Sequence, residues 1–189
     1  MVLLELRIDT ASSSLERLFQ VNNFNECVVI TAWNPIGRIA HQVEENRKDN
    51  QRLWDKLLGM GYLVLPAWGV PDAPVWPPEA SWLVLGLSKT KGLNLAEEFA
   101  QLAFVHCALD KQNKAVPRLV WTEGSSQENN DAFKSTTYMT APLDIHQGTS
   151  LQMWLRGTGA RRFQYSAVPS DHALFQTPYE DGYLIWLDA

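Results

Sequence analysis

The sequence predicts an α+β protein whose central part is ferredoxin-like, an antiparallel sheet with two helices on one face. Between residues 27 and 107, apolar runs of strand length alternate with helical repeats in the order strand, helix, strand, strand, helix, strand. After residue 110 the chain changes to short alternating or aromatic runs separated by Pro, Gly, Asp and Ser, a pattern typical of a β-rich extension.

Three parts are therefore expected. Residues 1–26 form an N-terminal framing segment, 27–110 the α+β core domain, and 111–189 a β-rich extension or small second domain. The chain has 189 residues, 46% of them hydrophobic, which is enough for a substantial core. The pattern leaves open whether the last part extends the first sheet or folds separately.

The framing segment contains a short apolar run at 2–8 and serines that can cap a short helix. The first core strand begins at Cys27 with a β-branched run. Pro35 has no N–H for a strand ladder and keeps Asn34 out of the helical region, so this strand is expected to end at Trp33 and Asn34.

The first core helix is expected from Val43, with Gly59 and Gly61 available as caps at its end. Asn46 and Asn50 lie on its apolar stripe, where a plain amphipathic helix carries Leu or Ala. A buried unpaired amide costs roughly 1–3 kcal/mol. These side chains therefore either satisfy backbone groups of the preceding loop or face a ligand.

The rest of the core follows in order. A second strand ends at Pro66, a loop rich in Pro and Trp runs over 67–78, and a third strand covers 81–87. Ser88 can cap the second helix. A fourth strand at 103–107 and a polar segment leading out of the unit complete the core, and further strands are expected at 133–140, 151–155, 162–167 and 183–187.

An ordered series of motifs carries a resemblance over about residues 27–107. It comprises ITAWNP, Glu45-Asn46-Arg47, Leu53, Gly61-Tyr62, Leu65-Pro66, Gly69, Trp76, Glu79, Ser81, LVLG at 83–86, Phe99 and Gln101. This series resembles a small bacterial family catalogued only as domain of unknown function 3293. Ala80 stands where a second acid is expected, and the chain past Arg118 has no counterpart. The resemblance supports the domain boundary and the site residues but implies no activity.

The suspected site lies around the loop after the first strand and the start of the first helix. An aromatic wall, amides and a fixed cation there suit a planar polar ligand. The expected ligand-binding residues are Trp33, Asn34, Asn46, Arg47, Asn50, Trp68, Trp76 and Ser81. The alternative is that Arg47 makes an ion pair, the amides cap the loop and the tryptophans fill the core.

If the protein is an enzyme, Glu79 and Glu45 are the candidates for an acid and base pair, with His41 as the histidine nearest the site. Catalytic residues are otherwise not expected. Cys27 and Cys107 fall inside predicted strands, and no Cys or His spacing predicts a metal site or a cofactor. The RGTGARR segment at 156–162 resembles an anion-binding loop, but no helix pattern follows it, so a basic hairpin tip between two strands is the preferred interpretation.

Charge and hydropathy limit the partners. The formal net charge of −5 disfavours nucleic acid, since phosphate binding needs a basic surplus. The N-terminal apolar run is too short for a signal peptide, and no apolar segment of spanning length follows, so we expect a cytoplasmic protein without membrane contact. A small molecule or a protein remains the expected partner, and a strand edge in the aromatic extension could support a homodimer.

Three hypotheses follow. The first is a small binding or interaction protein, because no catalytic constellation is recognisable. The second is an enzyme or enzyme relic acting on a nucleotide-like or other small polar molecule. The third is an accessory or inhibitor protein of a mobile genetic element, suggested by an unmatched tail joined to a sparse family.

Overall fold

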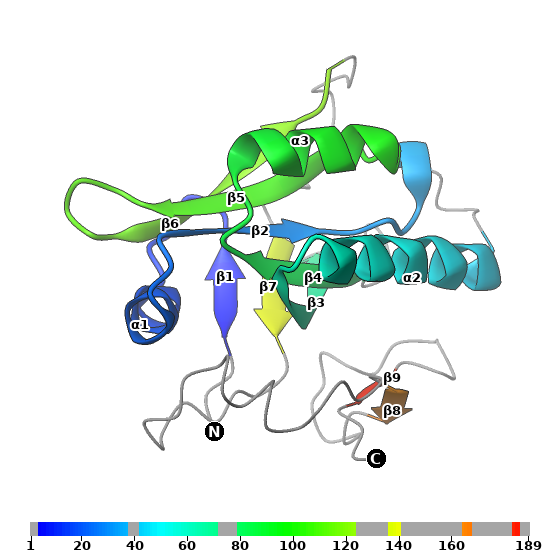
Figure 1. Ribbon diagram of the computed structural model, residues 1–189, viewed down its shortest axis with the longest axis horizontal. Helices are drawn as coiled ribbons and strands as arrows, with labels where there is room; N and C mark the ends of the chain where they lie inside the picture. Colours follow the sequence, from blue (N-terminus) through cyan, green and yellow to red (C-terminus); the bar gives the residue numbers. More distant parts are fainter. Residues whose placement is uncertain are drawn as a thin grey trace. The chain divides into compact units, whose positions relative to one another are not determined.

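The computed structural model describes residues 4–37, 42–71, 79–123, 136–140, 164–167 and 183–185. The chain divides into two compact units, with the boundary between residues 143 and 144. In the second unit, β8 (Gln164–Ala167) and β9 (Tyr183–Ile185) pair in an antiparallel sheet. The first unit carries the fold and the candidate site (Figure 1).

The described part of the first unit contains three α-helices and seven strands. In chain order they are β1 (Glu5–Arg7), α1 (Ser13–Asn22), β2 (Glu26–Ile30), α2 (Val43–Gly59), β3 (Leu63–Pro71), β4 (Glu79–Leu85), α3 (Lys89–Glu98), β5 (Ala103–Leu109), β6 (Ala115–Trp121) and β7 (Thr136–Thr140). A 3-10 turn, η1 (Pro35–Gly37), follows β2. The strands lie in the order β1-β7-β3-β4-β2-β5-β6, and every pair is antiparallel. The predicted α+β class is confirmed.

Five adjacent strands, β3-β4-β2-β5-β6, run from one end of this sheet, and β7 and β1 extend it beyond β3. The segment expected to lead out of the core instead turns between Asp110 and Lys114 and returns as β6, paired with β5. β6 and β7 therefore extend the first sheet, which was one of the two arrangements left open for residues 111–189.

Strand β3 continues through Pro66, where the sequence predicted its end. Pro66 lies opposite Trp82 of β4, and the pairing with β7 begins only at Ala67. The described residues of β7 therefore do not pair with Pro66, and a missing N–H on this edge of β3 breaks no bond of the described β3-β7 ladder. The prediction was wrong because one edge of a strand tolerates a proline.

Helices α2 and α3 lie beside one another on one face of the sheet, which we call the helix face (Figure 1). Trp82 of β4 packs on Trp54 of α2, with 4.5 Å between ring centroids, and its Nε1 donates to the Asn50 carbonyl. Lys56 of α2 makes an ion pair with Glu98 of α3. Both helices begin where the sequence predicted, and the Ser88 side chain caps α3 by accepting from the Lys91 N–H.

The opposite face, which we call the inner face, holds a second apolar layer. Its members include Cys27, Leu65, Leu83, Leu85 and Cys107, each at most 1% exposed. The segment after β1 closes toward β6, since the Asp9 and Ser12 N–H groups donate to the Pro117 and Ala115 carbonyls, both at 2.9 Å. Because β1 and β6 are the two ends of the strand order, the sheet curls around its inner face.

Gly92→Ala should destabilise the protein. A Cβ at residue 92 of α3 would lie 2.9 Å from Phe104 and 3.0 Å from Val28, both buried in strands. Overpacking of this kind costs about 1–3 kcal/mol, more than the helix propensity gained from alanine. Gly59→Ala is the matched control, because its Cβ would meet nothing within 4 Å. Urea unfolding of the two variants measures the difference, and equal stability would contradict the close packing of α3.

Candidate functional site

The loop after β2 adopts a strained conformation. Asn34 and Ile36 have φ of 48° and 60°, on either side of Pro35. Such a left-handed conformation is uncommon outside glycine, and for a β-branched residue it costs about 1–3 kcal/mol. Yet Ile36 is 57% exposed, so packing of its side chain does not repay this cost. Contacts with the backbone and with Asn34 must therefore hold the loop.

The first set of contacts comes from α2. Asn46 accepts from the Asn34 N–H at 2.8 Å through Oδ1 and donates to Asn34 Oδ1 at 2.9 Å through Nδ2. One turn later, Asn50 accepts from the Ala32 N–H at 3.0 Å and donates to the Ala80 carbonyl at 3.1 Å. Asn46 and Asn50 are 2% and 1% exposed. Their amides thus join the loop and β4 to the helix. This is the first of the two arrangements expected for them, in which they satisfy backbone groups instead of facing a ligand.

Two further groups hold the same loop. Thr31 Oγ1 accepts from the Trp33 N–H and donates to the Ala80 carbonyl at 2.6 Å. On the other side, the Ile36 N–H donates to the Ala100 carbonyl at 2.7 Å, and Gln101 Nε2 donates to the Trp33 carbonyl at 3.2 Å. The loop is therefore fixed between the start of α2 and the end of α3.

Glu79 lies at the end of this network. Its Oε1 accepts from Asn34 Nδ2 at 2.7 Å, so a continuous chain of hydrogen bonds runs from Asn46 through Asn34 to the carboxyl group. Glu79 is the first residue of β4, and the strand register places it on the inner face, like Ser81 and Leu83. The Asn34 amide, itself held by Asn46, thus positions a carboxyl group at the start of β4, on the inner face of the sheet.

One row of the sheet brings Tyr138 toward this carboxyl group. Glu79 pairs with Gly69 of β3, Gly69 pairs with Tyr138 of β7, and Tyr138 pairs with Leu6 of β1. The side chains of one such row point to the same face. Gly69 places no side chain between Glu79 and Tyr138, whose Cα atoms are separated by two strand spacings, roughly 10 Å.

The electrostatics of Glu79 differ from those of a surface carboxylate. Burial raises its pKa to about 7, while the hydrogen bond from Asn34 acts in the opposite direction. Burial and, secondarily, the charge of Glu79 also raise the pKa of Tyr138 well above its usual range. Among the described residues no cation contributes to the shift at Glu79. The site thus holds a carboxyl group whose pKa lies near neutral pH.

The structure brings together only some of the residues expected in the site. Asn34, Asn46, Asn50 and Glu79 form one network, and Ser81 lies beside it, with its Oγ donating to the Glu79 carbonyl at 3.2 Å. Trp33 is 9% exposed and holds the loop through its backbone. Trp68 is half-buried and pairs with Ala80, which places it on the helix face, opposite Glu79.

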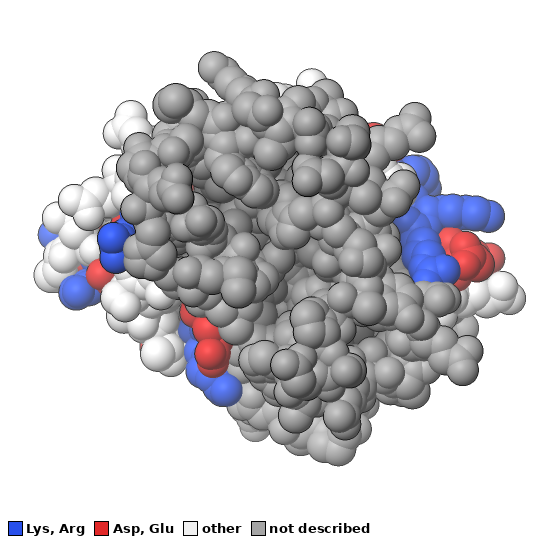
Figure 2. Space-filling view, turned by 90° about the horizontal axis from the view of Figure 1, so that it is seen from below, with Lys and Arg blue, Asp and Glu red and all other residues white. Residues whose placement is uncertain are grey.

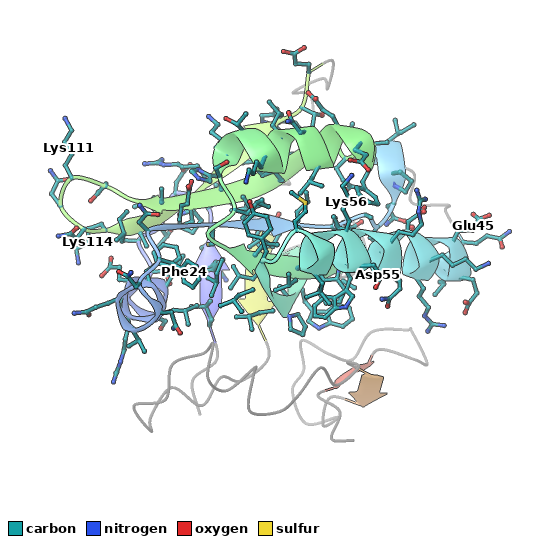
Figure 3. The ribbon with its side chains drawn as sticks, in the orientation of Figure 1. Phe24, Glu45, Asp55, Lys56, Lys111 and Lys114 are labelled. Atoms are coloured by element: carbon teal, nitrogen blue, oxygen red, sulfur yellow. The ribbon has the colours of Figure 1, made fainter. Side chains whose placement is uncertain are left out.

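An exposed ion pair lies at the start of α2. Arg47 donates to Glu44 at 2.7 Å in an exposed ion pair. Glu45 is exposed at the outer end of α2, as Figure 3 shows. His41, Trp76 and the 156–162 segment lie outside the described residues.

Three contributors were not expected as site residues. Thr31 and Gln101 belong to the motifs quoted for the family resemblance, and this was the only signal for them. Tyr138 had no signal, because strand order cannot be read from a local pattern. Within the described ranges, no cluster of His, Cys, Asp and Glu could hold a metal ion. Cys27 and Cys107 are free, buried and opposite one another, and burial followed by the hydrogen bond to Cys107 raises the pKa of Cys27.

Charged side chains on the described surface mix both signs. Ion pairs join Arg52 to Asp49, Lys114 to Glu16 and Arg118 to Asp9. Figure 2 shows, on the face that it presents, Lys and Arg next to Asp and Glu. None of the helices that the structure describes has the length and hydropathy needed to cross a membrane.

The fold and the site define an α+β protein with a carboxyl group set among amides at one end of its sheet. Residues 30–104 match the model of the family described as Protein of unknown function (DUF3293), and the resemblance predicted from the sequence is confirmed. Comparisons with curated proteins and with solved structures gave no match. The family description names no activity, so function has to be argued from the site.

Asn46→Leu should lower the free energy of unfolding by about 1–3 kcal/mol, because it leaves the buried Asn34 N–H without an acceptor. Gln51→Leu is the matched control, since Gln51 is exposed on the same helix and donates only to Asp55. Urea unfolding compares the two variants. If both lose the same stability, the Asn46 amide does not hold the loop.

Glu79→Gln should change the pH dependence of stability. A folded-state pKa of about 7 lies above the unfolded value, so the folded protein binds the extra proton. Stability therefore falls as pH rises from about 4.5 to 7, by up to about 3 kcal/mol from this group, and is level above that range. Glutamine still accepts from Asn34 but does not titrate.

Urea unfolding at pH 5 and pH 8 tests this sign. The wild type should lose about 2.5 kcal/mol relative to Glu79→Gln between the two pH values. Glu98→Gln, an exposed carboxylate paired with Lys56, is the control and should follow the wild type apart from its surface ion pair. Parallel curves for the wild type and Glu79→Gln would rule out the raised pKa.

Proposed function

We propose that the protein is a small-molecule-binding protein whose site is the Glu79 carboxyl group together with Asn34 and Tyr138. The observation that carries this proposal is the Asn46-Asn34-Glu79 chain of hydrogen bonds, which fixes a carboxyl group at the start of β4, on the inner face of the sheet. The amides of Asn46 and Asn50 are engaged by the protein itself. Ligand recognition therefore shifts from the loop amides, where the sequence suggested it, to the carboxyl group that they position.

Energetic considerations support a binding role. A carboxyl group whose pKa is raised by burial destabilises the fold at neutral pH, because the unfolded chain ionises more readily. A glutamine at the same position would accept the same Asn34 bond without that cost. A group that lowers stability while a neutral substitute is sterically available is typical of a functional site.

An enzyme acting on a small polar molecule is the second candidate, and one observation favours it. A general acid or base works best when its pKa lies near the operating pH, and that of Glu79 is about 7. In this role Glu79 would exchange a proton with the bound molecule, while Asn34 would orient the carboxyl group. Glu45 is exposed at the outer end of α2, so Glu79 would act without it as the paired acid.

The fold carries a proposal of its own. We infer that β2, α2, β3, β4, α3 and β5 form a ferredoxin-like unit, which the spatial order β3-β4-β2-β5 supports. In such a unit the loop after the first strand and the start of the third strand lie at the same end of the sheet. Asn34 and Glu79 occupy these two places. The accessory or inhibitor role stays a prediction from the sequence.

A thermal-shift screen of nucleotides, nucleobases, amino acids and amines should give at least one ligand that raises the melting temperature of the wild type. Saturation at about 100 times Kd adds about 2.7 kcal/mol to the stability of the folded state. Glu79→Gln should abolish the shift, and Glu98→Gln should retain it, because Glu98 is exposed on α3. A ligand that stabilises wild type and Glu79→Gln equally would overturn the proposed site. Turnover of a ligand that Glu79→Gln still binds but does not convert would establish the enzymatic alternative.

A further inference from the structure

The Glu79 carboxylate has no positively charged partner among the described residues. Among the described residues, the carboxyl group receives one hydrogen bond, from the neutral Asn34 amide, and no cation acts on it. The described groups next to it are also neutral, namely Asn34 from the loop, Gly69 from β3 and Tyr138 from β7, whose pKa the charge of Glu79 raises. A buried carboxylate without a countercharge is costly, and an opposite charge within about 4–6 Å removes much of that cost.

The row of the sheet that holds Glu79, Gly69 and Tyr138 suits a small cationic group. Gly69 leaves no side chain of β3 between Glu79 and Tyr138. Both flanking groups can accept hydrogen bonds, the carboxylate through its oxygens and the tyrosine through its hydroxyl oxygen. An ammonium group has three donors and no acceptor, so it matches a pair of acceptors better than an anion or a carbonyl group does.

We propose that the ligand of this site is a small organic cation whose ammonium group binds between the Glu79 carboxylate and the Tyr138 hydroxyl, beside Gly69. This inference rests on the proposed binding function and names its ligand class. Binding then requires ionised Glu79. Among the described groups that face the site, Glu79 alone changes charge between pH 6 and pH 8, since Asn34 and Gly69 do not titrate and the pKa of Tyr138 is raised above this range.

Calorimetric titration with n-butylamine tests the proposal, with 1-butanol as the neutral isostere and butyrate as the anionic one. The amine stays protonated at pH 6 and pH 8, whereas the ionised fraction of Glu79 rises roughly tenfold, so amine affinity should rise roughly tenfold. Neither 1-butanol nor butyrate should bind comparably.

Four variants locate the binding. Glu79→Gln should abolish it, Tyr138→Phe should weaken it severalfold, and Glu98→Gln should leave it unchanged. Gly69→Val should block it by placing a side chain between the two acceptors. Tyr138→Phe keeps the ring, so it tests the site even if Gly69→Val fails to fold.

Two results would overturn the cationic ligand. The first is no measurable amine binding to the folded wild type at either pH, or amine binding that Glu79→Gln retains. The second is that 1-butanol binds as tightly as the amine and that Gly69→Val blocks its binding. In the second case the site and the binding function would stand while the ligand class would be wrong, so the two failures are distinguishable.

Discussion

The hydrogen bonds from Asn46 to Asn34 are the contact on which this end of the protein depends. They couple the start of α2 to a loop whose backbone is strained at Asn34 and Ile36. Two buried bonds with full partners offset strain of this size, whereas the exposed Ile36 side chain offers little. The orientation of Asn34, and with it the donor to Glu79, is therefore a consequence of α2 docking on the sheet.

Much of this arrangement could be predicted from the sequence. The cap at Ser88, the span of α2 and the α+β class follow from local chemistry, namely a serine cap and helical spacing. The end of β2 does not, because the strand stops at Ile30, before the predicted end at Trp33 and Asn34. The anomaly of Asn46 and Asn50 on an apolar stripe was also visible, and their pairing with backbone groups was one of the two interpretations considered. These are features that neighbours in the sequence determine.

What could not be predicted depends on distant parts of the chain. Pro66 ends a strand by local rules, yet it is tolerated because β7 begins to pair with β3 only one residue later. Tyr138 reaches the site through the β3-β7 pairing, which joins residues about 70 positions apart. Trp68 seemed to adjoin the site, but alternation along β3 turns it to the opposite face. Strand order and register were the missing information in all three cases.

The closure of the sheet connects the local loop contacts with the order of the strands. The bonds from Asp9 and Ser12 to β6 bring the ends of the strand order together, and the inner face becomes a second interior. A carboxyl group on the helix face would have met α2 and its amides, but Glu79 points to the side enclosed by the curled sheet. Its contact with Asn34 is therefore made at the end of the sheet, where β4 begins and the loop after β2 lies. The raised pKa of Glu79 follows from that position, since the enclosed side removes water from the carboxyl group while the end of the sheet supplies a single neutral donor.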